Sequence, residues 1–315
     1  MQVKPGQPKV SIIIGNWNGL EDTRECLESL KKITYSNYDV ILVDNKSTGN
    51  DVQVLRDEFT DYIHVIENEK DYGFTGGANI GMKYAMVNSR PDYILLLNND
   101  TIVDANFLTY LVEAAESRKS AGVVGGKIFF SRNPNQIQIV WGKTDLWHWQ
   151  IFLPVPRYSL YRKIVDKGQY NYLRDVEWVS GCVILIKKDV INKIGLLEES
   201  YFGGCEDYDY CFRAKKTGFA ILYTHRAQIW HKNAQSYIKN KIEVQRAYFD
   251  ARNRFIFMKK HASKPQYMLF ILNCFTIYFW YRTAVFVLII RKPAMVASHF
   301  KGMMDGFSLK VDPVL

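Results

Sequence analysis

Apolar runs alternate with amphipathic stretches over the first 130 residues of the chain. The runs predict short strands, at residues 10–14, 40–43, 63–66, 93–97 and 123–130. The stretches between them predict helices, at residues 20–32, 52–59, 76–87 and 104–117. Because strand–helix alternation is typical of parallel pairing, and unbroken apolar strands are buried on both faces, we expect an α/β fold. Its sheet should be mainly parallel, with helices on both faces.

The pattern is less regular beyond residue 130. Residues 133–175 predict an insertion with short strands, and residues 178–186 predict another strand. Helices are expected at residues 189–194 and 205–217. Residues 240–262 predict a strongly basic helix.

An apolar segment, residues 266–290, follows the basic helix and contains a single charge, Arg282. A membrane span needs about 20 apolar residues, so this segment is long enough to cross a bilayer. It is rich in Tyr, Phe and Trp, which favour the membrane interface. We therefore divide the chain into an α/β domain, residues 1–239, and a C-terminal membrane-associating region, residues 240–315. A helix lying on the membrane is favoured over a spanning helix or one buried in protein without lipid contact.

The net charge of +9 suits an anionic partner, such as a nucleotide diphosphate, acidic lipid headgroups or nucleic acid. Because much of the basic excess lies near the apolar segment, lipid is favoured over nucleic acid. The basic side chains expected to meet lipid headgroups are Arg246, Arg252, Arg254, Lys259 and Lys260.

Five cysteines without a CxxC pair indicate a reducing compartment. The N-terminal residues lack the apolar core of a signal peptide. We therefore expect a peripheral protein at the cytoplasmic face of the cell membrane.

Polar side chains follow three of the predicted strands. Asn16 follows the first, Asp44 the second, and Asn98, Asn99 and Asp100 the fourth. Ligands of parallel α/β sheets bind beyond the carboxyl ends of the strands, so these residues are candidate binding groups. Asp100 is a candidate ligand for Mg²⁺ or Mn²⁺, and the two amides can orient sugar or ribose hydroxyls. Helix capping by Asp or Asn is the alternative explanation for each position taken alone.

An acidic cluster follows a glycine turn at residues 203–204. It contains Glu206, Asp207 and Asp209, with Arg213 about two turns later. Clustered carboxylates raise one another's pKa, and such a group can accept a proton from a hydroxyl nucleophile. Arg213 is expected to pair with one of the acids. Stabilisation of a helix N-terminus by its acids is the alternative reading.

His231 together with Asp100 would form a mixed oxygen and nitrogen site, which suits Mn²⁺ better than Mg²⁺. A histidine alone is more often a satisfied core residue. Glycines of the segment GFTGGANIG, residues 73–81, open a helix and allow a diphosphate to approach closely. This segment is not the dinucleotide-binding GxGxxG pattern.

Seven motifs occur in one order along the chain: VSIIIGNWNG (10–19), VDNKST (43–48), GFTGGANIG (73–81), LLNNDT (96–101), WVSGC (178–182), EDYDYCFR (206–213) and His231. This set resembles the inverting family-2 glycosyltransferases with a GT-A fold, and is most similar to their rhamnosyltransferase-like and galactofuranosyltransferase-like branch. The resemblance covers about residues 8–260.

The resemblance implies a role for each matching position. Asp207 corresponds to the general base, and Glu206, Asp209 and Arg213 support it. Asp100 and His231 correspond to the metal ligands for Mn²⁺ or Mg²⁺, although Asn98 replaces the first acid of the family's DxD motif. Trp178 and Gly181 lie where the family shapes the acceptor side. The positions expected to bind the nucleotide sugar are Asn16, Asp44, Gly77, Asn79, Asn98 and Asn99.

The implied activity is metal-dependent transfer of a sugar from a nucleotide-diphosphate donor to a hydroxyl of a glycan acceptor, which we expect to be polyprenol-linked. A nucleotidyltransferase is a weaker alternative, because no glycine- and basic-rich phosphate loop follows the first strand. A non-catalytic nucleotide-binding membrane protein is another, and the presence of Asp100, Asp207 and His231 argues against it. The donor sugar, its nucleotide, the acceptor and the oligomeric state stay open.

Overall fold

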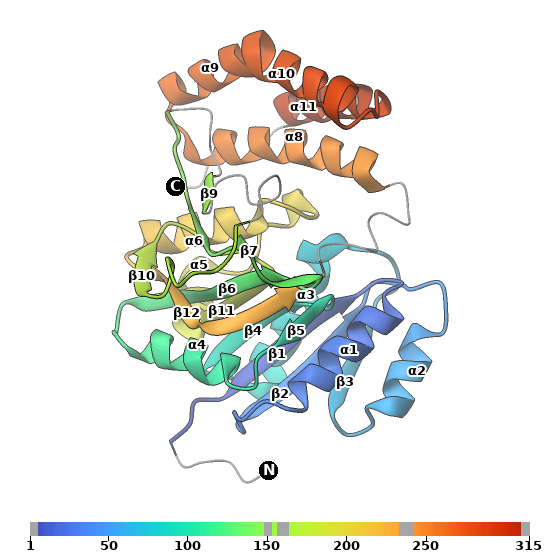
Figure 1. Cartoon of the computed structure of the whole chain (residues 1–315), viewed down its shortest axis with the longest axis vertical. Helices are drawn as coiled ribbons and strands as arrows, with labels where there is room; N and C mark the ends of the chain where they lie inside the picture. Colours follow the sequence, from blue (N-terminus) through green and yellow to red (C-terminus); the bar gives the residue numbers. More distant parts are fainter. Residues whose placement is uncertain (1–5, 148–152, 156–163, 233–241, 310–315) are drawn as a thin grey trace.

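The computed structural model describes residues 6–147, 153–155, 164–232 and 242–309. Ten strands form one sheet that carries helices on both faces, and a separate group of helices lies at one end of the molecule (Figure 1). The eight strands along the main path of the sheet are, in spatial order, β10 (Leu173–Val176), β12 (Ala220–His231), β6 (Ala121–Phe130), β11 (Val183–Lys187), β4 (Tyr93–Asn98), β1 (Val10–Asn16), β2 (Tyr38–Asp44) and β3 (Ile63–Glu67).

Short strands complete the β structure. β5 (Thr101–Val103) pairs with β12, and β7 (Asn133–Ile139) pairs with β6. A separate two-stranded sheet joins β8 (Trp141–Lys143) and β9 (Leu153–Val155). The expectation of short strands within residues 133–175 is therefore met by β7, β8, β9 and β10.

The predicted α/β class is confirmed. Strands β3, β2, β1 and β4 pair in parallel, as do β6 and β12. β11 runs antiparallel to both of its neighbours, β4 and β6. The parallel half places the ends of β1, β2 and β4 at one edge, because Asn16 lies opposite Asp44, and Gly15 lies opposite Asn98.

Helices cover both faces of the sheet, and the alternation of side chains along β1 shows why. Ile12 and Ile14 pack in the core cluster that contains Leu27 of α1, whereas Ile13 packs in a second cluster with Met82 of α3. The helices of the α/β domain are α1 (Leu20–Leu30), α2 (Asp51–Glu58), α3 (Gly73–Tyr84), the π-helical η1 (Ala85–Ser89), α4 (Phe107–Glu116), α5 (Lys188–Ile194), the 3-10 helix η2 (Glu199–Tyr201) and α6 (Glu206–Lys216).

Two elements differ from the sequence prediction. The strand predicted at 178–186 begins only at Val183, because the chain turns at residues 178–182 and the Val183 N–H donates to the Ser180 carbonyl. Buried apolar residues in this turn, such as Trp178, explain the error. The long strand β12 has no counterpart in the prediction, since Thr224, His225 and Arg226 interrupt its apolar pattern.

The C-terminal region forms a helical layer. It comprises α8 (Ile242–His261), α9 (Lys264–Asn273), the π-helical η3 (Cys274–Tyr278), α10 (Phe279–Ala284), the π-helical η4 (Val285–Ile289) and α11 (Ala294–Ser308). α8 lies between the α/β domain and the other helices, and α9, α10 and α11 run along it on its far side (Figure 1). Residues 264–289 form a helix that is long and apolar enough to cross a membrane. The predicted domain boundary at 239/240, and residues 240 and 241 of the predicted basic helix, lie outside the described residues.

One core cluster joins the two regions. It contains Tyr201 and Cys205 of the α/β domain together with Phe257 of α8, Phe270 of α9 and Met303 of α11. Close helix packing supports it, because a Cβ at Gly302 of α11 would lie 2.2 Å from the Tyr248 carbonyl oxygen of α8. α8 therefore has a hydrophobic face on each side, one toward the α/β domain and one toward the outer helices.

Candidate active site

The ends of β1 and β2 carry a buried polar network. The Asn16 Nδ2 donates to Asp44 Oδ1 at 2.8 Å, and the Thr23 hydroxyl donates to Asn16 Oδ1 at 2.7 Å. Asp44 Oδ2 accepts the N–H of Ser47 at 2.9 Å. Asn16 and Asp44 are thus brought together as the strand register predicts, and Thr23 and Ser47 are partners that sequence reasoning missed.

The amides that follow β4 extend this network. Asn99 Nδ2 donates to the Thr23 hydroxyl at 2.8 Å, so Thr23 connects Asn99 to Asn16. The backbone N–H of Asn98 donates to the Cys182 carbonyl at 3.0 Å. These contacts fix the orientation of the residues that precede Asp100.

Two predicted donor-binding positions on α3, Gly77 and Asn79, have packing or hydrogen-bond partners within the protein. A Cβ at Gly77 would lie 2.8 Å from Asn45 Nδ2, so glycine allows α3 to approach the end of β2. Asn79 is 2% exposed, and its side-chain amide donates to the Leu197 carbonyl at 2.9 Å and accepts from the Leu197 N–H at 3.0 Å. The structure therefore groups Asn79 with the segment before α6 and away from the strand-end network.

Asp100 and His231 meet across the β5–β12 pair. His231 Nε2 lies 3.0 Å from Asp100 Oδ1, and both side chains are largely buried. His231 Nδ1 lies 3.0 Å from Gln138 Oε1 of β7. A Gln138 oxygen that accepts the Nδ1 proton leaves Nε2 available to a metal ion, as second-shell partners of metal-binding histidines do. Gln138 is a further residue that the sequence did not single out.

The charges around this pair favour a positive charge, either a proton on the imidazole or a metal ion in its place. Burial opposes protonation of the imidazole, but the neighbouring Cys182 and the Asp100 carboxylate raise the pKa of His231 well above its ordinary value. Among the described residues, no group of three or more His, Cys, Asp or Glu side chains could hold a metal ion. A divalent ion bound by Asp100 and His231 would complete its coordination with substrate phosphate oxygens and water, as Mg²⁺ commonly does. The donor set fits such an ion.

Asp207 lies in the first turn of α6, after two residues with left-handed backbone, Gly204 (φ +81°) and Cys205 (φ +78°). Its Oδ2 accepts the Gly181 N–H at 2.8 Å, and its Oδ1 accepts the Tyr208 N–H at 2.9 Å. Burial raises the pKa of Asp207 to about 6, although the two amide donors oppose the rise. As a whole residue Asp207 is partly exposed, and a proton acceptor must be within reach of the substrate.

Glu206 is more deeply buried than Asp207. Burial, followed by the charge of Asp207, raises the pKa of Glu206 to about 8. Its Oε2 has no hydrogen-bond partner among the described residues. Because their environments differ, the two neighbouring acids have different pKa values, so that Glu206 can be protonated while Asp207 is ionised.

The turn at Gly181 and Cys182 connects the two halves of the site. The Gly181 N–H contacts the Asp207 carboxylate, and the Cys182 carbonyl accepts from the N–H of Asn98, two residues before Asp100. The Cys182 side chain also interacts with His231. The three predicted positions 100, 207 and 231 therefore converge on one turn at the strand ends.

The other predicted supporting residues form a buried cluster behind Asp207. Arg213 Nε donates to Asp209 Oδ2 at 2.7 Å, which confirms the predicted pairing with one of the acids. His261 of α8 contacts Asp209 Oδ1 at 2.7 Å, and this imidazole was not predicted. Burial opposes ionisation of Asp209, but His261 and Arg213 lower its pKa overall.

Trp178 takes a different place from Gly181. Its side chain is 1% exposed, its Nε1 donates to the Lys143 carbonyl at 3.2 Å, and its ring packs edge-on against Tyr208 at 4.2 Å. Direct contact of this indole with an acceptor is therefore excluded in this conformation. If Trp178 influences acceptor binding, it does so through its contact with Tyr208, the residue next to Asp207.

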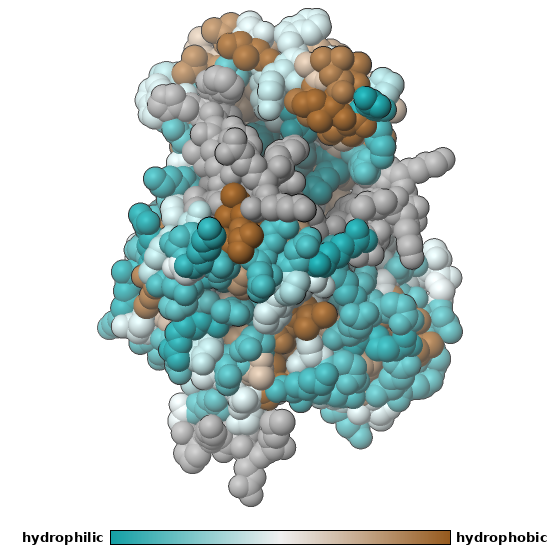
Figure 2. Space-filling model, viewed as in Figure 1, coloured by the Kyte–Doolittle hydropathy of each residue, from teal (hydrophilic) through white to brown (hydrophobic). Residues whose placement is uncertain are grey.

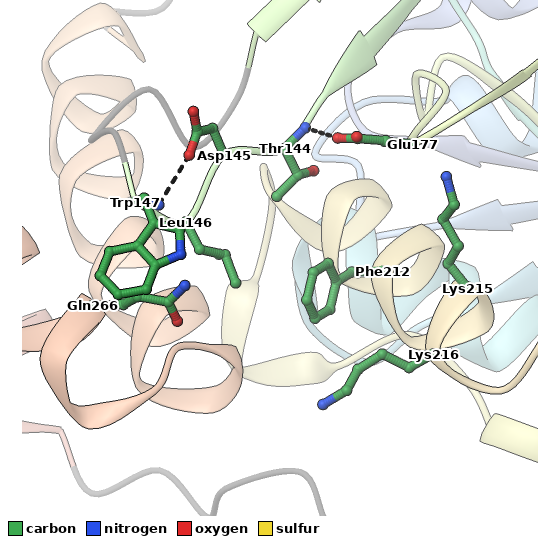
Figure 3. A pocket seen from close by; sticks show the side chains of 9 residues that line it. All are labelled: Thr144, Asp145, Leu146, Trp147, Glu177, Phe212, Lys215, Lys216 and Gln266. Atoms are coloured by element: carbon green, nitrogen blue, oxygen red, sulfur yellow. Dashed lines mark hydrogen bonds between the residues drawn. The ribbon is translucent and has the colours of Figure 1, made fainter.

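A cavity of about 480 Å³ lies elsewhere, between α6 and the start of α9 (Figure 3). Asp100, Asp207 and His231 are not among its lining residues. The side chains that line it are Thr144, Asp145, Leu146, Trp147, Glu177, Phe212, Lys215, Lys216 and Gln266.

Polar strand ends, a carboxylate–imidazole pair and a carboxylate of raised pKa near them are the kinds of group that a group-transfer enzyme uses. The family described as "Glycosyltransferase like family 2" matches residues 8–253. The chain belongs to this family and is a glycosyltransferase.

Relatives and solved structures agree with this assignment. The low-salt glycan biosynthesis hexosyltransferase Agl10 of Haloferax volcanii is 25% identical over 81% of this chain and 77% of that protein. The chain spans less than two thirds of several other curated relatives. Two solved structures share the fold with TM-scores of 0.59. GalNAc-T7 with UDP, GalNAc and Mn²⁺ is 16% identical over 91% of this chain and 59% of that one. The mannosyltransferase PcManGT of Pyrobaculum calidifontis with GDP-Man and Mn²⁺ is 12% identical over 96% of this chain and 88% of that one.

Proposed function

We propose that this glycosyltransferase moves a sugar from a nucleotide diphosphate to a hydroxyl group of a glycan in one inverting displacement, with Asp207 as the general base. The observation that carries the proposal is the convergence of Asp207, Asp100 and His231 on the Gly181–Cys182 turn. It puts a proton acceptor beside a pair of side chains suited to a cation.

The donor side of the proposal rests on the strand-end network. Asn16 and Asp44 lie where a nucleotide would bind beyond the carboxyl ends of β1 and β2. Asn99 contacts Thr23 of this network, and Asn98 and Asn99 immediately precede Asp100, the proposed metal ligand. The mannosyltransferase and GalNAc-T7 structures contain nucleotides and Mn²⁺, which supports a divalent cation, Mn²⁺ or Mg²⁺, at Asp100 and His231.

The chemistry follows from the charges of these residues. At neutral pH, a pKa of about 6 leaves Asp207 mostly ionised and still basic enough to accept a proton. It takes the acceptor hydroxyl proton as that oxygen bonds to the anomeric carbon, and the bond from this carbon to the diphosphate oxygen breaks. A bound divalent cation supplies charge neutralisation for the departing diphosphate. One displacement needs no covalent intermediate, so a single carboxylate base suffices.

The outer helices support contact with a membrane, and we propose a peripheral position on its cytoplasmic face and a lipid-linked acceptor. Apolar side chains gather over this layer (Figure 2). Only 22% of the apolar window within residues 264–289 is buried in the protein. Because the helix runs along α8, its exposed side can rest in a membrane interface. Large exposed apolar side chains on it are Met268, Leu269, Leu272, Ile277, Trp280, Tyr281, Leu288 and Ile289.

Several basic residues of α8 do not have the lipid-facing role expected from the sequence. Lys260 is buried and pairs with Glu198, and Lys259 donates to the carbonyls of Phe307 and Leu309. Arg252 donates to the Ser200 carbonyl at 2.8 Å. The lipid-binding proposal therefore rests on the apolar side chains, with Arg246, Arg291 and Lys292 as exposed basic groups.

The test is a transfer assay with nucleotide-diphosphate sugars, Mn²⁺ and lipid-linked glycan acceptors, in which NMR reads the anomeric configuration of the product. We expect a product of configuration opposite to that of the donor. Donors are first selected by the rise in melting temperature that ligand binding to the native state causes. Retention of configuration would contradict the single displacement. Nucleotidyl transfer in place of sugar transfer would contradict the proposed reaction.

A further inference from the structure

Helix α8 contacts the segment that leads into the catalytic helix α6. Asn253 is 1% exposed, and its Nδ2 lies within hydrogen-bond distance of three carbonyl oxygens, those of Tyr201 (3.0 Å), Gly203 (2.9 Å) and Gly204 (2.7 Å). The three carbonyls of this turn therefore share one buried side-chain amide. Few side chains other than asparagine have both the length and the two N–H donors for this arrangement.

This turn has a backbone conformation that needs support. Gly204 has φ +81° and Cys205 has φ +78°, and the latter is a region that non-glycine residues rarely adopt. Such conformations are unfavourable and persist only where surrounding contacts hold them. Asp207 follows Cys205 by two residues, so the turn sets where the carboxylate of Asp207 points relative to the Gly181 N–H.

A second contact from α8 reaches the helix itself. His261 Nε2 lies 2.7 Å from Asp209 Oδ1, and both side chains are fully buried. The Tyr201 hydroxyl donates to the same oxygen at 3.2 Å, and Arg213 holds the other oxygen. Because Asp209 lies in the first turn of α6 with Asp207, this contact limits rotation and translation of that turn.

Two further contacts secure the segment before α6. Lys260 pairs with Glu198, and Arg252 donates to the Ser200 carbonyl at 2.8 Å. All four α8 side chains reach residues 198–209, and none of them is among the predicted metal ligands or donor contacts. A membrane anchor alone would not require this set of buried polar contacts with the catalytic domain.

We propose that α8 positions the general base, with Asn253 and His261 as positioning residues that fix the turn at residues 203–205 and the first turn of α6. The proposal rests on the proposed function, in which Asp207 is the base. It makes the C-terminal region part of the active-site structure as well as its attachment to a membrane.

The test uses point variants of the full chain, because removal of the outer helices would expose the core cluster that α8 shares with them. The variants are Asn253→Ala, His261→Ala and His261→Gln, which retains an N–H donor. The matched controls are Asn273→Ala and His299→Ala, since these residues are buried in α9 and α11 and no hydrogen bond joins them to residues 198–209. Turnover, donor KM and melting temperature are measured for each.

For Asn253→Ala and His261→Ala we expect kcat to fall about 10- to 100-fold, as misplacement of a reacting group by about 1 Å does, with donor KM changed less than about twofold. His261→Gln should recover most of the turnover lost in His261→Ala. The controls should lower melting temperature without this loss of kcat. Equal losses of kcat in Asn253→Ala and Asn273→Ala, in proportion to the folded fraction, would overturn the positioning role.

Amide hydrogen exchange gives a readout that needs no substrate, and separates the two proposals. Asn253→Ala should increase exchange in residues 203–209 and leave exchange in β1 and β2 unchanged. Unchanged exchange in residues 203–209 would contradict the positioning role, whatever the activity. Faster exchange there in the variant, when the wild-type protein itself transfers no sugar, would support the positioning role and contradict the proposed function. If Asn253→Ala does not fold, Asn253→Ser takes its place in both measurements.

Discussion

The strand-end region and the α8 region position catalytic groups in different ways. At the strand ends, Asn16 and Asp44 are the last residues of β1 and β2, and Asp100 follows β4 by two residues, so the register of the sheet brings these strand ends to one edge. In the α8 region, Asn253 and His261 reach residues about fifty positions earlier in the chain. The positions at the strand ends follow from the pairing of neighbouring strands. The α8 contacts depend on how the helical region packs against the α/β domain.

The two regions therefore differ in role: one contacts the reacting groups, and the other holds them in position. The strand ends hold the groups that we expect to touch the donor and the cation, and the first turn of α6 holds Asp207, which we expect to contact the acceptor. The α8 region holds none of these groups, but it fixes the turn from which Asp207 projects. Substitutions of residues that contact the substrates or the cation should therefore abolish binding or turnover. Substitutions in the helical region should reduce turnover only partly.

The largest effect is expected for Asp207→Asn. Loss of the proton acceptor should lower kcat by about 10²- to 10⁴-fold, the usual contribution of a general base. Binding of the nucleotide sugar, measured by calorimetry, should stay within a few-fold of wild type. Asp57→Asn, an exposed acid on α2, is the control. If Asp207→Asn keeps a substantial rate, the base lies elsewhere, and the proposed difference between the two regions does not hold.

Asp100→Asn and His231→Gln should weaken Mn²⁺-dependent binding of nucleoside diphosphates, by about 10- to 100-fold if the effect is like that of other losses around a metal site. The reason is that the two side chains are adjacent and of the right ligand types. Electron paramagnetic resonance of Mn²⁺ measures the change directly. His225→Gln on the same strand is the matched control, and equal weakening in this variant would argue against a specific site.

Trp280→Glu and Leu288→Glu test the membrane role of the helical region. Each removes an exposed apolar side chain whose burial in a bilayer interface would contribute about 1.5–3 kcal/mol, or roughly a tenfold or greater change in partitioning. Co-sedimentation with anionic vesicles measures it. Val87→Glu, on the α/β domain and equally exposed, should have no effect. Unaltered sedimentation of both helix variants would mean that another surface contacts the membrane.

The last prediction concerns the stability of the protein, which should change gradually from one pH unit to the next. The pKa of Glu206 is raised in the folded state, from 4.5 to about 8, so the unfolded state releases this proton first as the pH rises. Wild-type stability should therefore decline between about pH 4.5 and 8 relative to Glu206→Gln, by at most about 1.4 kcal/mol per pH unit. Urea unfolding at several pH values measures this difference. Glu28→Gln, an exposed control, should show no such trend; a pH-independent difference for Glu206→Gln would show that Glu206 is ionised throughout.

Sequence reasoning succeeded at the strand ends for a physical reason. Continuous apolar runs identify buried strands, and parallel register then predicts that Asn16 and Asp44 are neighbours. The pairing of Asp100 with His231 followed from the resemblance and from the ligand types, because β12 itself was not predicted. Arg213 was expected to pair with an acid, but spacing alone did not identify Asp209.

The remaining residues were not predictable because their partners are distant in the chain. Gln138 lies in a segment without regular hydrophobic spacing, and nothing local indicates that it faces His231. Lys260 and Arg252 belong to a basic helix next to an apolar segment, a pattern typical of lipid contact. Their burial against Glu198 and Ser200 depends on docking of α8, which no local pattern encodes.

The central claim is that Asp100, His231 and Asp207 share one crevice around a cation and an activated sugar. Anomalous scattering from Mn²⁺ in crystals with a nucleoside diphosphate tests it most directly. We predict one peak about 2–2.3 Å from a carboxylate oxygen of Asp100 and from His231 Nε2, with diphosphate oxygens in its coordination shell and Asp207 facing the same crevice. A Mn²⁺–diphosphate complex bound away from Asp100 and His231 would contradict the account.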